Sequence, residues 1–386
     1  MFLMLLHKIY INRIGLLIMK GKVVVKRCDS YSLSEVEKEI INVLGLLDFR
    51  FKKGIRVLIK PNILGVHKPE QAITTHPVLV EGVCKILEKK NAKIYIGESS
   101  ASESDKAFEI SGIAKIARKY GKIIYFEKEK KIKVNAGKFG DLYLPSIIRD
   151  VDLIINMPKL KTHSLTKMTG AVKNLFGFIS GGMKSSYHRI YTSDEKMSEL
   201  FVEIYNHIKP GLNIMDGIIG LEGNGPGTGG LPRETGIILV SKNAVAMDIV
   251  ASEIIGYKAM EIQTNKIARE QELVDSVEII GDAKDVRIDY KKPISTGKGI
   301  GIAYFISSII PDSKIGFNHD KCTKCGKCRD NCPTKAIIMK PFPECTHKKC
   351  IKCFCCIEVC PENAVYLKMP LIRRIAERGY RMISGS

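Results

Sequence analysis

The sequence predicts an α/β protein in which helices cover both faces of a mainly parallel sheet, followed by a small C-terminal α+β module. From residue 22 onward, runs of valine, isoleucine and leucine alternate with longer amphipathic segments. Parallel strands that are buried on both faces have such continuous apolar sequences. Ten of the twelve cysteines come after residue 320, where this alternation has ended. The 386 residues are therefore expected to form a large α/β domain and a separate cysteine-rich module.

The elements of the α/β domain follow from the apolar pattern in chain order. Strands are expected at residues 22–28, 55–61, 92–98, 123–126, 151–157 and 236–240. Helices are expected at residues 33–46 with Ser32 as the N-cap, after Pro77, and at residues 105–120, 195–208 and 244–255. The expected domains are an N-terminal extension (1–21), the α/β domain (22–290), a connector (291–313), the cysteine module (314–369) and a basic amphipathic tail (370–386).

The apolar N-terminus is a poor membrane segment. His7, Lys8 and Arg13 interrupt it, so no run of about 20 apolar residues is available to span a bilayer. It also lacks the small-residue cleavage site of a signal peptide. We therefore expect translation to begin at Met19 and the protein to be cytoplasmic.

Two copies of one cysteine pattern, C-x2-C-x2-C-x3-C-P, lie in the C-terminal module. The first copy contains Cys322, Cys325, Cys328 and Cys332, and the second contains Cys350, Cys353, Cys356 and Cys360. In this pattern three cysteines hold one [4Fe-4S] cluster, and the cysteine before proline binds the neighbouring cluster. The spacing predicts two clusters, one on Cys322, Cys325, Cys328 and Cys360 and the other on Cys350, Cys353, Cys356 and Cys332.

The two copies are an internal repeat with an offset of 28 residues, and other uses of the cysteines fit less well. Structural zinc sites usually separate C-x2-C pairs by a longer spacer, and disulfide frameworks need an oxidising compartment. Cys345 and Cys355 remain as spare thiols or packing residues. Residues 317–369 resemble a two-cluster bacterial-type ferredoxin, which implies a ferredoxin-like α+β fold and electron transfer.

Polar residues follow the predicted strands of the α/β domain, where ligands of parallel sheets bind. Lys159, Lys161, Lys173 and Asn174 lie in the segment 158–178, whose part from Met168 is expected to be helical, and form a candidate anion site. His163 in the same segment is a candidate acid–base group or an ordinary hydrogen-bonding residue. The other candidate substrate-binding residues are Lys60, Asn62, Glu98 and Asp216.

The glycine-rich segment 222–230 contains a G-x-G-x-x-G spacing, but no helix is expected directly after it. The dinucleotide-binding motif requires that helix, so the segment is expected to be a loop over a ligand instead. The sequence also lacks the phosphate-binding G-x4-G-K-[ST] motif, the HExxH motif and the G-x-S-x-G motif. Readings as a P-loop ATPase, a zinc protease or a serine hydrolase of these types therefore lose support.

The motifs IKPN, PKLKTH, TGAVKNLFG and EGNGP resemble the domain-of-unknown-function family numbered three-six-two. This family often carries a two-cluster ferredoxin module at its C-terminus. The resemblance would cover residues 22–285 and implies no particular activity, substrate or catalytic residue.

Electron transfer by two [4Fe-4S] clusters is the function expected first, with a small anionic substrate in the α/β domain as the candidate acceptor. A scaffold or cluster-assembly role is the alternative. The net charge of +20 indicates an acidic redox partner, nucleic acid or simply a lysine-rich composition. Nucleic-acid binding is unlikely because the sequence contains no signature of a nucleic-acid-binding fold.

Overall fold

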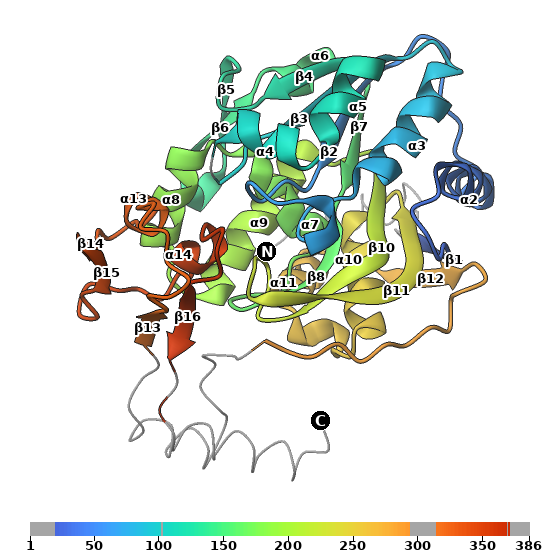
Figure 1. Ribbon diagram of the computed structural model, residues 1–386. Helices are drawn as coiled ribbons and strands as arrows, with labels where there is room; N and C mark the ends of the chain where they lie inside the picture. Colours follow the sequence, from blue (N-terminus) through green and yellow to red (C-terminus); the bar gives the residue numbers. More distant parts are fainter. Residues whose placement is uncertain (1–19, 102, 294–313, 369, 371–386) are drawn as a thin grey trace, which may run out of the picture.

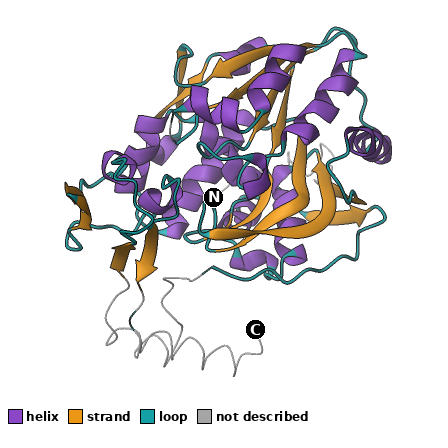
Figure 2. Ribbon diagram, in the orientation of Figure 1, coloured by secondary structure: helices purple, strands orange, loops and turns teal. Residues whose placement is uncertain are grey.

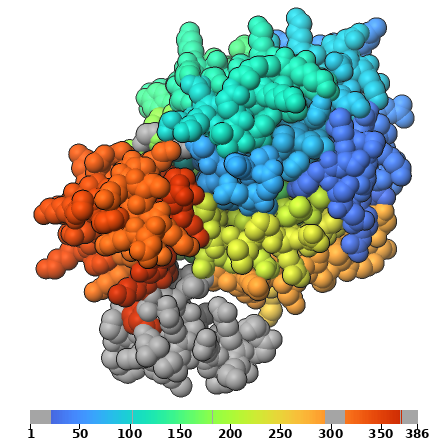
Figure 3. All heavy atoms as spheres, in the orientation of Figure 1, coloured from blue at the N-terminus to red at the C-terminus, as the bar shows by residue number. Residues whose placement is uncertain are grey.

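The computed structural model of the protein describes residues 20–101, 103–293, 314–368 and 370. The cysteine module lies beside the α/β domain, in contact with it (Figures 1 and 3). The predicted N-terminal extension, the connector and the tail lie almost entirely outside the described residues.

The α/β domain is built on a mixed but mainly parallel sheet with the strand order β12-β1-β11-β10-β7-β2-β3-β4 (Figures 1 and 2). Strands β10, β7, β2, β3 and β4 run parallel, and so do β12 and β1. Strand β11 is antiparallel to both of its neighbours. The bounds are β1 (Lys20–Arg27), β2 (Arg56–Pro61), β3 (Lys93–Glu98), β4 (Lys122–Tyr125), β7 (Leu153–Met157), β10 (Leu212–Gly223), β11 (Gly230–Ser241) and β12 (Ser276–Ile280). The predicted fold class is confirmed.

Helices cover both faces of the sheet, which explains the continuous apolar strands. Val24 of β1 packs into the core on one face, whereas Val23 and Val25 pack into the core on the other. All three side chains are fully buried. On the first face lie α2 (Leu33–Leu46), α3 (Pro77–Glu88), α4 (Ser104–Ile110) and α5 (Ile113–Tyr120). On the second face lie α7 (Gly170–Asn174), α9 (Asp194–Ile208), α10 (Ala244–Ile254) and α11 (Gln263–Glu270).

The structure differs from the sequence-based expectation at three elements. The helix expected at residues 105–120 is two helices, because Gly112 adopts a left-handed φ of 75° between them. The polar residues after β7, where no strand was expected, form another strand, β8 (Lys159–His163), which pairs with β10 and with β9 (Lys167–Met168). The helix expected from residue 168 is the short α7 followed by the 3₁₀ helix η3 (Leu175–Phe178).

Smaller elements complete the domain. They are β5 (Lys131–Asn135), β6 (Asp141–Pro145), α6 (Ile147–Asp150), α8 (Gly181–Ile190), η1 (Pro69–Gln71), η2 (Gly137–Phe139) and η4 (Ala259–Glu261). Strands β5 and β6 form an antiparallel pair. Helix α8 follows η3 and matters for the site described below.

The cysteine module consists of two similar halves. The elements of the first half are β13 (Lys314–Phe317), α13 (Lys327–Asp330) and β14 (Ile337–Lys340), and those of the second are β15 (Phe342–Cys345), α14 (Cys355–Glu358) and β16 (Val365–Lys368). The backbone repeats as the sequence does, because Lys324 and Lys352 have φ of 57° and 54°, and Lys335 and Asn363 have φ of 51° and 49°. Each pair is separated by the 28-residue offset of the sequence repeat.

Candidate functional site

The eight cysteines of the repeats line two cavities in the module. One cavity is lined by Cys322, Cys325, Cys328 and Cys360. The other is lined by Cys332, Cys350, Cys353 and Cys356, together with Cys345. Each cavity thus combines three cysteines of one repeat with the fourth cysteine of the other, the same grouping that the spacing predicts.

The surroundings of the cysteines suit a multi-iron cluster. The backbone N–H of Ala336 donates to Cys332 Sγ at 3.2 Å, and that of Ala364 donates to Cys360 Sγ at 3.2 Å. Hydrogen bonds to cluster sulfurs are one means by which proteins tune iron–sulfur centres. In the part of the chain that the structure describes, no three His, Cys, Asp or Glu side chains are placed to hold a single metal ion. The cysteines instead surround a space, as the ligands of a cubane must.

The module contacts the α/β domain through α14 and through the glycine-rich loop between β10 and β11. Thr228 Oγ1 in this loop donates to the carbonyl oxygen of Cys360 at 3.1 Å. A Cβ atom on Gly227 would lie 3.3 Å from the carbonyl oxygen of Glu358, so the two backbones pack closely. The loop thus packs against α14, and one of its residues, Pro226, reaches the cavity described next.

A polar cavity of about 100 Å³ lies between the α/β domain and α14. Six of the side chains singled out in the sequence line it, namely Asn62, Glu98, Lys161, His163, Lys173 and Asn174. They come from the ends of β2 and β3, from β8 and from α7. Cys355 and Glu358 of α14 close the cavity from the side of the module. Its place at the carboxyl ends of parallel strands is the usual ligand site of such sheets.

Lys161 is held at the cavity by a buried chain of asparagines. Its Nζ donates to Asn62 Oδ1 at 2.8 Å and to the carbonyl oxygen of Ile73 at 2.8 Å. Asn62 donates to Asn174 at 2.9 Å, Asn174 donates to Asn156 at 2.7 Å, and Asn156 donates to Asn213 at 2.9 Å. Because every amide donates in the same direction along the chain, the bonds polarise one another. Among the residues that the structure describes, no carboxylate is bonded to Lys161, and burial lowers its pKa to about 7.

Lys60 and Glu98 form a buried ion pair behind the cavity wall. The Nζ–Oε2 distance is 2.6 Å, and the side chains are 0% and 3% exposed. Burial lowers the pKa of Lys60, and the carboxylate of Glu98 opposes that shift. A Cβ atom on Gly177 would lie 2.1 Å from Glu98 Oε1 and 2.6 Å from Lys60 Nζ. Position 177 therefore requires glycine for η3 to approach this pair.

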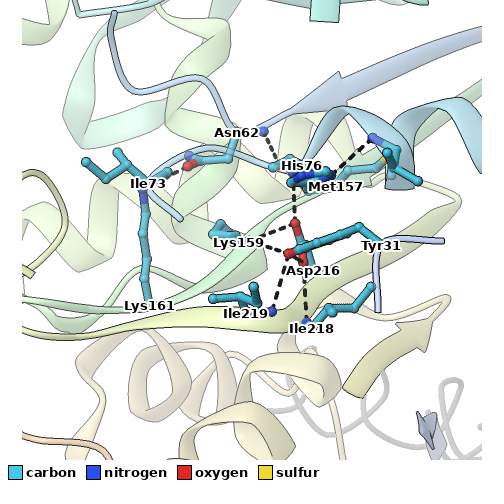
Figure 4. A network of polar contacts seen from close by, with 12 residues as sticks. Tyr31, Asn62, Ile73, His76, Met157, Lys159, Lys161, Asp216, Ile218 and Ile219 are labelled. Carbon is cyan, nitrogen blue, oxygen red and sulfur yellow. Dashed lines mark hydrogen bonds and ion pairs between the residues drawn. The ribbon is translucent and has the colours of Figure 1, made fainter. Parts of the chain in front are cut away.

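Lys159 and Asp216 belong to a separate buried network (Figure 4). Lys159 Nζ donates to Asp216 Oδ2 at 2.9 Å and to Tyr31 Oη at 2.9 Å, and Tyr31 donates to Asp216 Oδ1 at 2.8 Å. The backbone N–H of His76 also donates to Asp216, at 2.8 Å, and the imidazole ring of His76 stacks on the ring of Tyr31. Neither Lys159 nor Asp216 lines the cavity. The expected convergence of Lys159 with Lys161 and Lys173 is therefore only partial, because Lys159 faces Asp216.

His163 lies at the contact between the domain and α14. Its Nδ1 accepts hydrogen bonds from the backbone N–H groups of Leu165 and Thr166, at 3.0 and 3.2 Å. A proton on the neutral ring therefore resides on Nε2, which lies 3.3 Å from Glu358 Oε1 without the alignment of a good hydrogen bond. Burial lowers the pKa of His163 to about 4, so the ring is neutral at pH 7. This geometry favours a positioning role toward Glu358.

Lys173 and Asn174 are positioned by Asp248 of α10. Its carboxylate accepts the backbone N–H groups of Ala171 and Val172, at 2.5 and 2.9 Å, and thereby caps the first turn of α7. Burial raises the pKa of Asp248 to about 7, and the two backbone hydrogen bonds oppose that shift. Lys173 Nζ lies 4.9 Å from the centre of the Phe201 ring.

Helix α8 and two loops contribute further polar side chains to the cavity. The sequence analysis missed Lys184 and His188 of α8, whereas Ser99 and Thr169 lie in segments that it singled out. Lys184 donates a hydrogen bond to the carbonyl oxygen of Ser99, and burial lowers its pKa to about 8. The i, i+4 spacing of Lys184 and His188 places both on one face of α8, but the sequence gives no sign of this helix.

Comparison with known proteins agrees with this architecture. In the described part of the chain, no helix is long and apolar enough to cross a membrane. The thylakoid-associated protein sll1697 of Synechocystis sp. is 33% identical over 243 residues, which are 62% of this chain and 75% of that protein. The family model of the 4Fe-4S binding domain (Fer4) matches residues 315–338, which contain the first cysteine repeat, and identifies an iron–sulfur protein. The model of the domain of unknown function DUF362 matches residues 57–253, about half of the chain, and the protein belongs to this family.

Proposed function

We propose that the protein is a two-cluster electron-transfer protein that reduces a small anionic substrate in the cavity between its domains. The first [4Fe-4S] cluster would be bound by Cys322, Cys325, Cys328 and Cys360, and the second by Cys332, Cys350, Cys353 and Cys356. The two cysteine-lined cavities and the paired N–H···S hydrogen bonds support this assignment.

One observation carries the proposed substrate reduction. Helix α14 begins with Cys355 and Cys356, and it contributes Cys355 and Glu358 to the wall of the polar cavity. Cys356 is also one of the cysteines of the second cluster cavity. A single turn of helix thus separates a proposed cluster from a lysine-lined site. Electron transfer over such a short path needs no further carrier.

The proposed reaction is a two-electron reduction of the substrate, and the two electrons are supplied one at a time. When bound, each cluster supplies one electron, so the two together supply the pair for a substrate that also takes up two protons from solvent. An external electron-carrier protein of low potential must then restore both electrons. Lys321 and Lys324, exposed beside the exposed Cys325, would attract an acidic carrier. We place the protein in the cytoplasm, because eight ligand thiols must stay reduced before cluster insertion.

A cluster-assembly or scaffold role is the second candidate. Cys345 lines the second cluster cavity beside its four proposed ligands, where an additional thiolate could bind iron in transit. Such a role gives no reason for a lysine-rich cavity on the other side of α14. The cavity therefore favours electron transfer to a bound anion.

Anaerobic purification followed by two measurements tests the proposal. We expect about eight iron and eight acid-labile sulfide per chain, and Cys332→Ser should damage the cluster of the second repeat. The dithionite-reduced protein is then mixed with anionic metabolites, and oxidation of the clusters is followed by absorbance. A substrate should oxidise the wild-type protein faster than the Lys173→Met variant with equal iron content. Equal rates for every compound would argue against the cavity as the reduction site, and transfer of clusters to an apo-protein would favour assembly.

A further inference from the structure

The charges around the cavity are not balanced by the described residues. Lys60 neutralises Glu98 through their buried ion pair. The remaining charged groups of the lining are three lysines, Lys161, Lys173 and Lys184, against Glu358 alone. Three positive charges against one negative charge leave two without a counterpart. A bound ligand with two negative charges would balance them.

Apart from His163 Nε2, which faces Glu358, three buried polar atoms of the lining also lack partners. Ser99 Oγ, Thr169 Oγ1 and His188 Nδ1 form no hydrogen bond with any residue that the structure describes. Their residues are only 2%, 7% and 7% exposed. Buried polar atoms nearly always have a partner in a folded protein. These atoms therefore mark the position of a polar ligand beside Lys173 and Lys184.

The volume of the cavity limits the size of that ligand. A water molecule needs about 10–15 Å³ in this measure, so about 100 Å³ holds roughly seven to ten non-hydrogen atoms. So small a space favours two charges on one group over two separate carboxylates. We propose that the ligand is a small phosphate-bearing molecule, bound as a dianion by Lys173, Lys184, Thr169 and His188. This inference rests on the proposed function, because it names the substrate class of the same cavity.

Binding of the dianion should also take up protons. Burial lowers the pKa of Lys161 to about 7 and that of Lys184 to about 8, so part of their charge is lost at neutral pH. A dianion stabilises the protonated ammonium groups and restores that charge. Anion-binding surfaces made of exposed lysines would show no such proton uptake at neutral pH, because their lysines are already fully charged.

Calorimetric titration of the full-length, anaerobically purified protein with inorganic phosphate tests the inference. At pH 8, where inorganic phosphate is already mainly the dianion, and at constant ionic strength, we expect phosphate to bind at least tenfold more tightly than acetate or nitrate, and more tightly than malonate. Titrations in two buffers with different ionisation enthalpies should show proton uptake. Lys184→Gln and Thr169→Val should each weaken phosphate binding severalfold with unchanged iron content. Lys196→Gln, at an exposed lysine on α9, is the matched control and should bind like the wild type.

The possible results separate this inference from the proposed function. Equal affinity for phosphate and acetate, or tighter binding of malonate, would overturn the phosphate assignment while leaving reduction of another anion intact. Loss of iron in Lys184→Gln with unchanged phosphate binding in Thr169→Val would show that the lysines serve the clusters, which also overturns the assignment. If no anion binds and none oxidises the reduced clusters, both the inference and the proposed substrate reduction fail.

Discussion

Replacing Asp216 by asparagine tests whether the network of Figure 4 is structural. Asp216 is fully buried and accepts from Lys159 Nζ, from Tyr31 Oη and from the backbone N–H of His76. Asparagine keeps the shape but removes the negative charge and puts an N–H₂ group among these donors. The Lys159 ammonium then stays buried without its counterion. Breaking a buried ion pair in this way costs about 3–5 kcal/mol.

The assay is thermal unfolding followed by circular dichroism, on variants with the same iron content as the wild type. For a domain of this size, each kcal/mol lowers the Tm by about 2–4 °C, so the predicted decrease is about 6–20 °C. The control is Asp152→Asn, because Asp152 pairs with Arg56 at 2.7 Å but both side chains are nearly half exposed. This variant should unfold almost like the wild type, since exposed ion pairs contribute little.

Two results would refute the reasoning about Asp216. If Asp216→Asn and Asp152→Asn have the same Tm, burial of the Lys159–Asp216 pair adds nothing to stability. If Asp216→Asn keeps its stability but gains affinity for phosphate, Lys159 is available as an anion ligand. The double variant Lys159→Met/Asp216→Asn should lose less stability than the sum of the two single variants, because it leaves no unpaired charge.

Three further predictions concern the cavity. Gly177→Ala should destabilise the protein by about 1–3 kcal/mol, because the methyl group of the alanine would collide with the buried Lys60–Glu98 pair. The control is Gly45→Ala, where nothing lies within 4 Å of the added methyl group, and it should stabilise α2 slightly in the same unfolding assay. The affinity for sulfate, which stays a dianion between pH 6 and pH 9, should be highest below pH 7 and should fall as the pH rises through the values of about 7 and 8 at which Lys161 and Lys184 lose their protons. A sulfate affinity that stays the same from pH 6 to pH 9, measured by calorimetry, would contradict this. Saturating phosphate should lower the reduction potential of the nearer cluster in a redox titration, because a nearby anion opposes an added electron. By linkage, reduction of the cluster must weaken phosphate binding by the same free energy, about tenfold in affinity for each 59 mV by which phosphate lowers the potential. A reduction potential that does not change with phosphate would exclude this coupling.

The sequence predicted the cavity residues that follow strands better than those that depend on distant partners. Asn62 and Glu98 were found because the carboxyl ends of parallel strands meet at one edge of a sheet. The sequence did not reveal the role of Lys159, because its partner Asp216 lies 57 residues away along the chain and the two meet only in the folded protein. The sequence analysis predicted no strand at the residues of β8 and described them only as polar residues that follow the strand at 151–157. All five residues of β8 are buried, because Lys159 and Lys161 find partners there.

Helix α8 shows a different limit of sequence reasoning. Its sequence, GGMKSSYHRI, begins with two glycines and has no apolar stripe, so it gives no helix signal. Nevertheless it contributes Lys184 and His188 to the cavity. A functional helix that faces a polar cavity lacks the apolar stripe by which amphipathic helices are recognised. The cysteine repeats, by contrast, could be recognised from the sequence. The spacing of the proposed ligand cysteines is local, so the required geometry is encoded within a few residues.

The contacts between the two domains explain why they belong to one chain. His163 meets Glu358, Thr228 bonds to the backbone at Cys360, and Lys327 pairs with Glu103 at 3.3 Å. Glu358 is the last residue of α14 and Cys360 follows it, so these contacts hold the helix turn between the polar cavity and the second cluster cavity against the α/β domain. A separate ferredoxin would have to dock anew for every electron, whereas a linked module is held at a high effective concentration. Under the proposed function, fusion would leave the exposed face with Lys321 and Lys324 free for an external donor, while the covered face would serve the cavity.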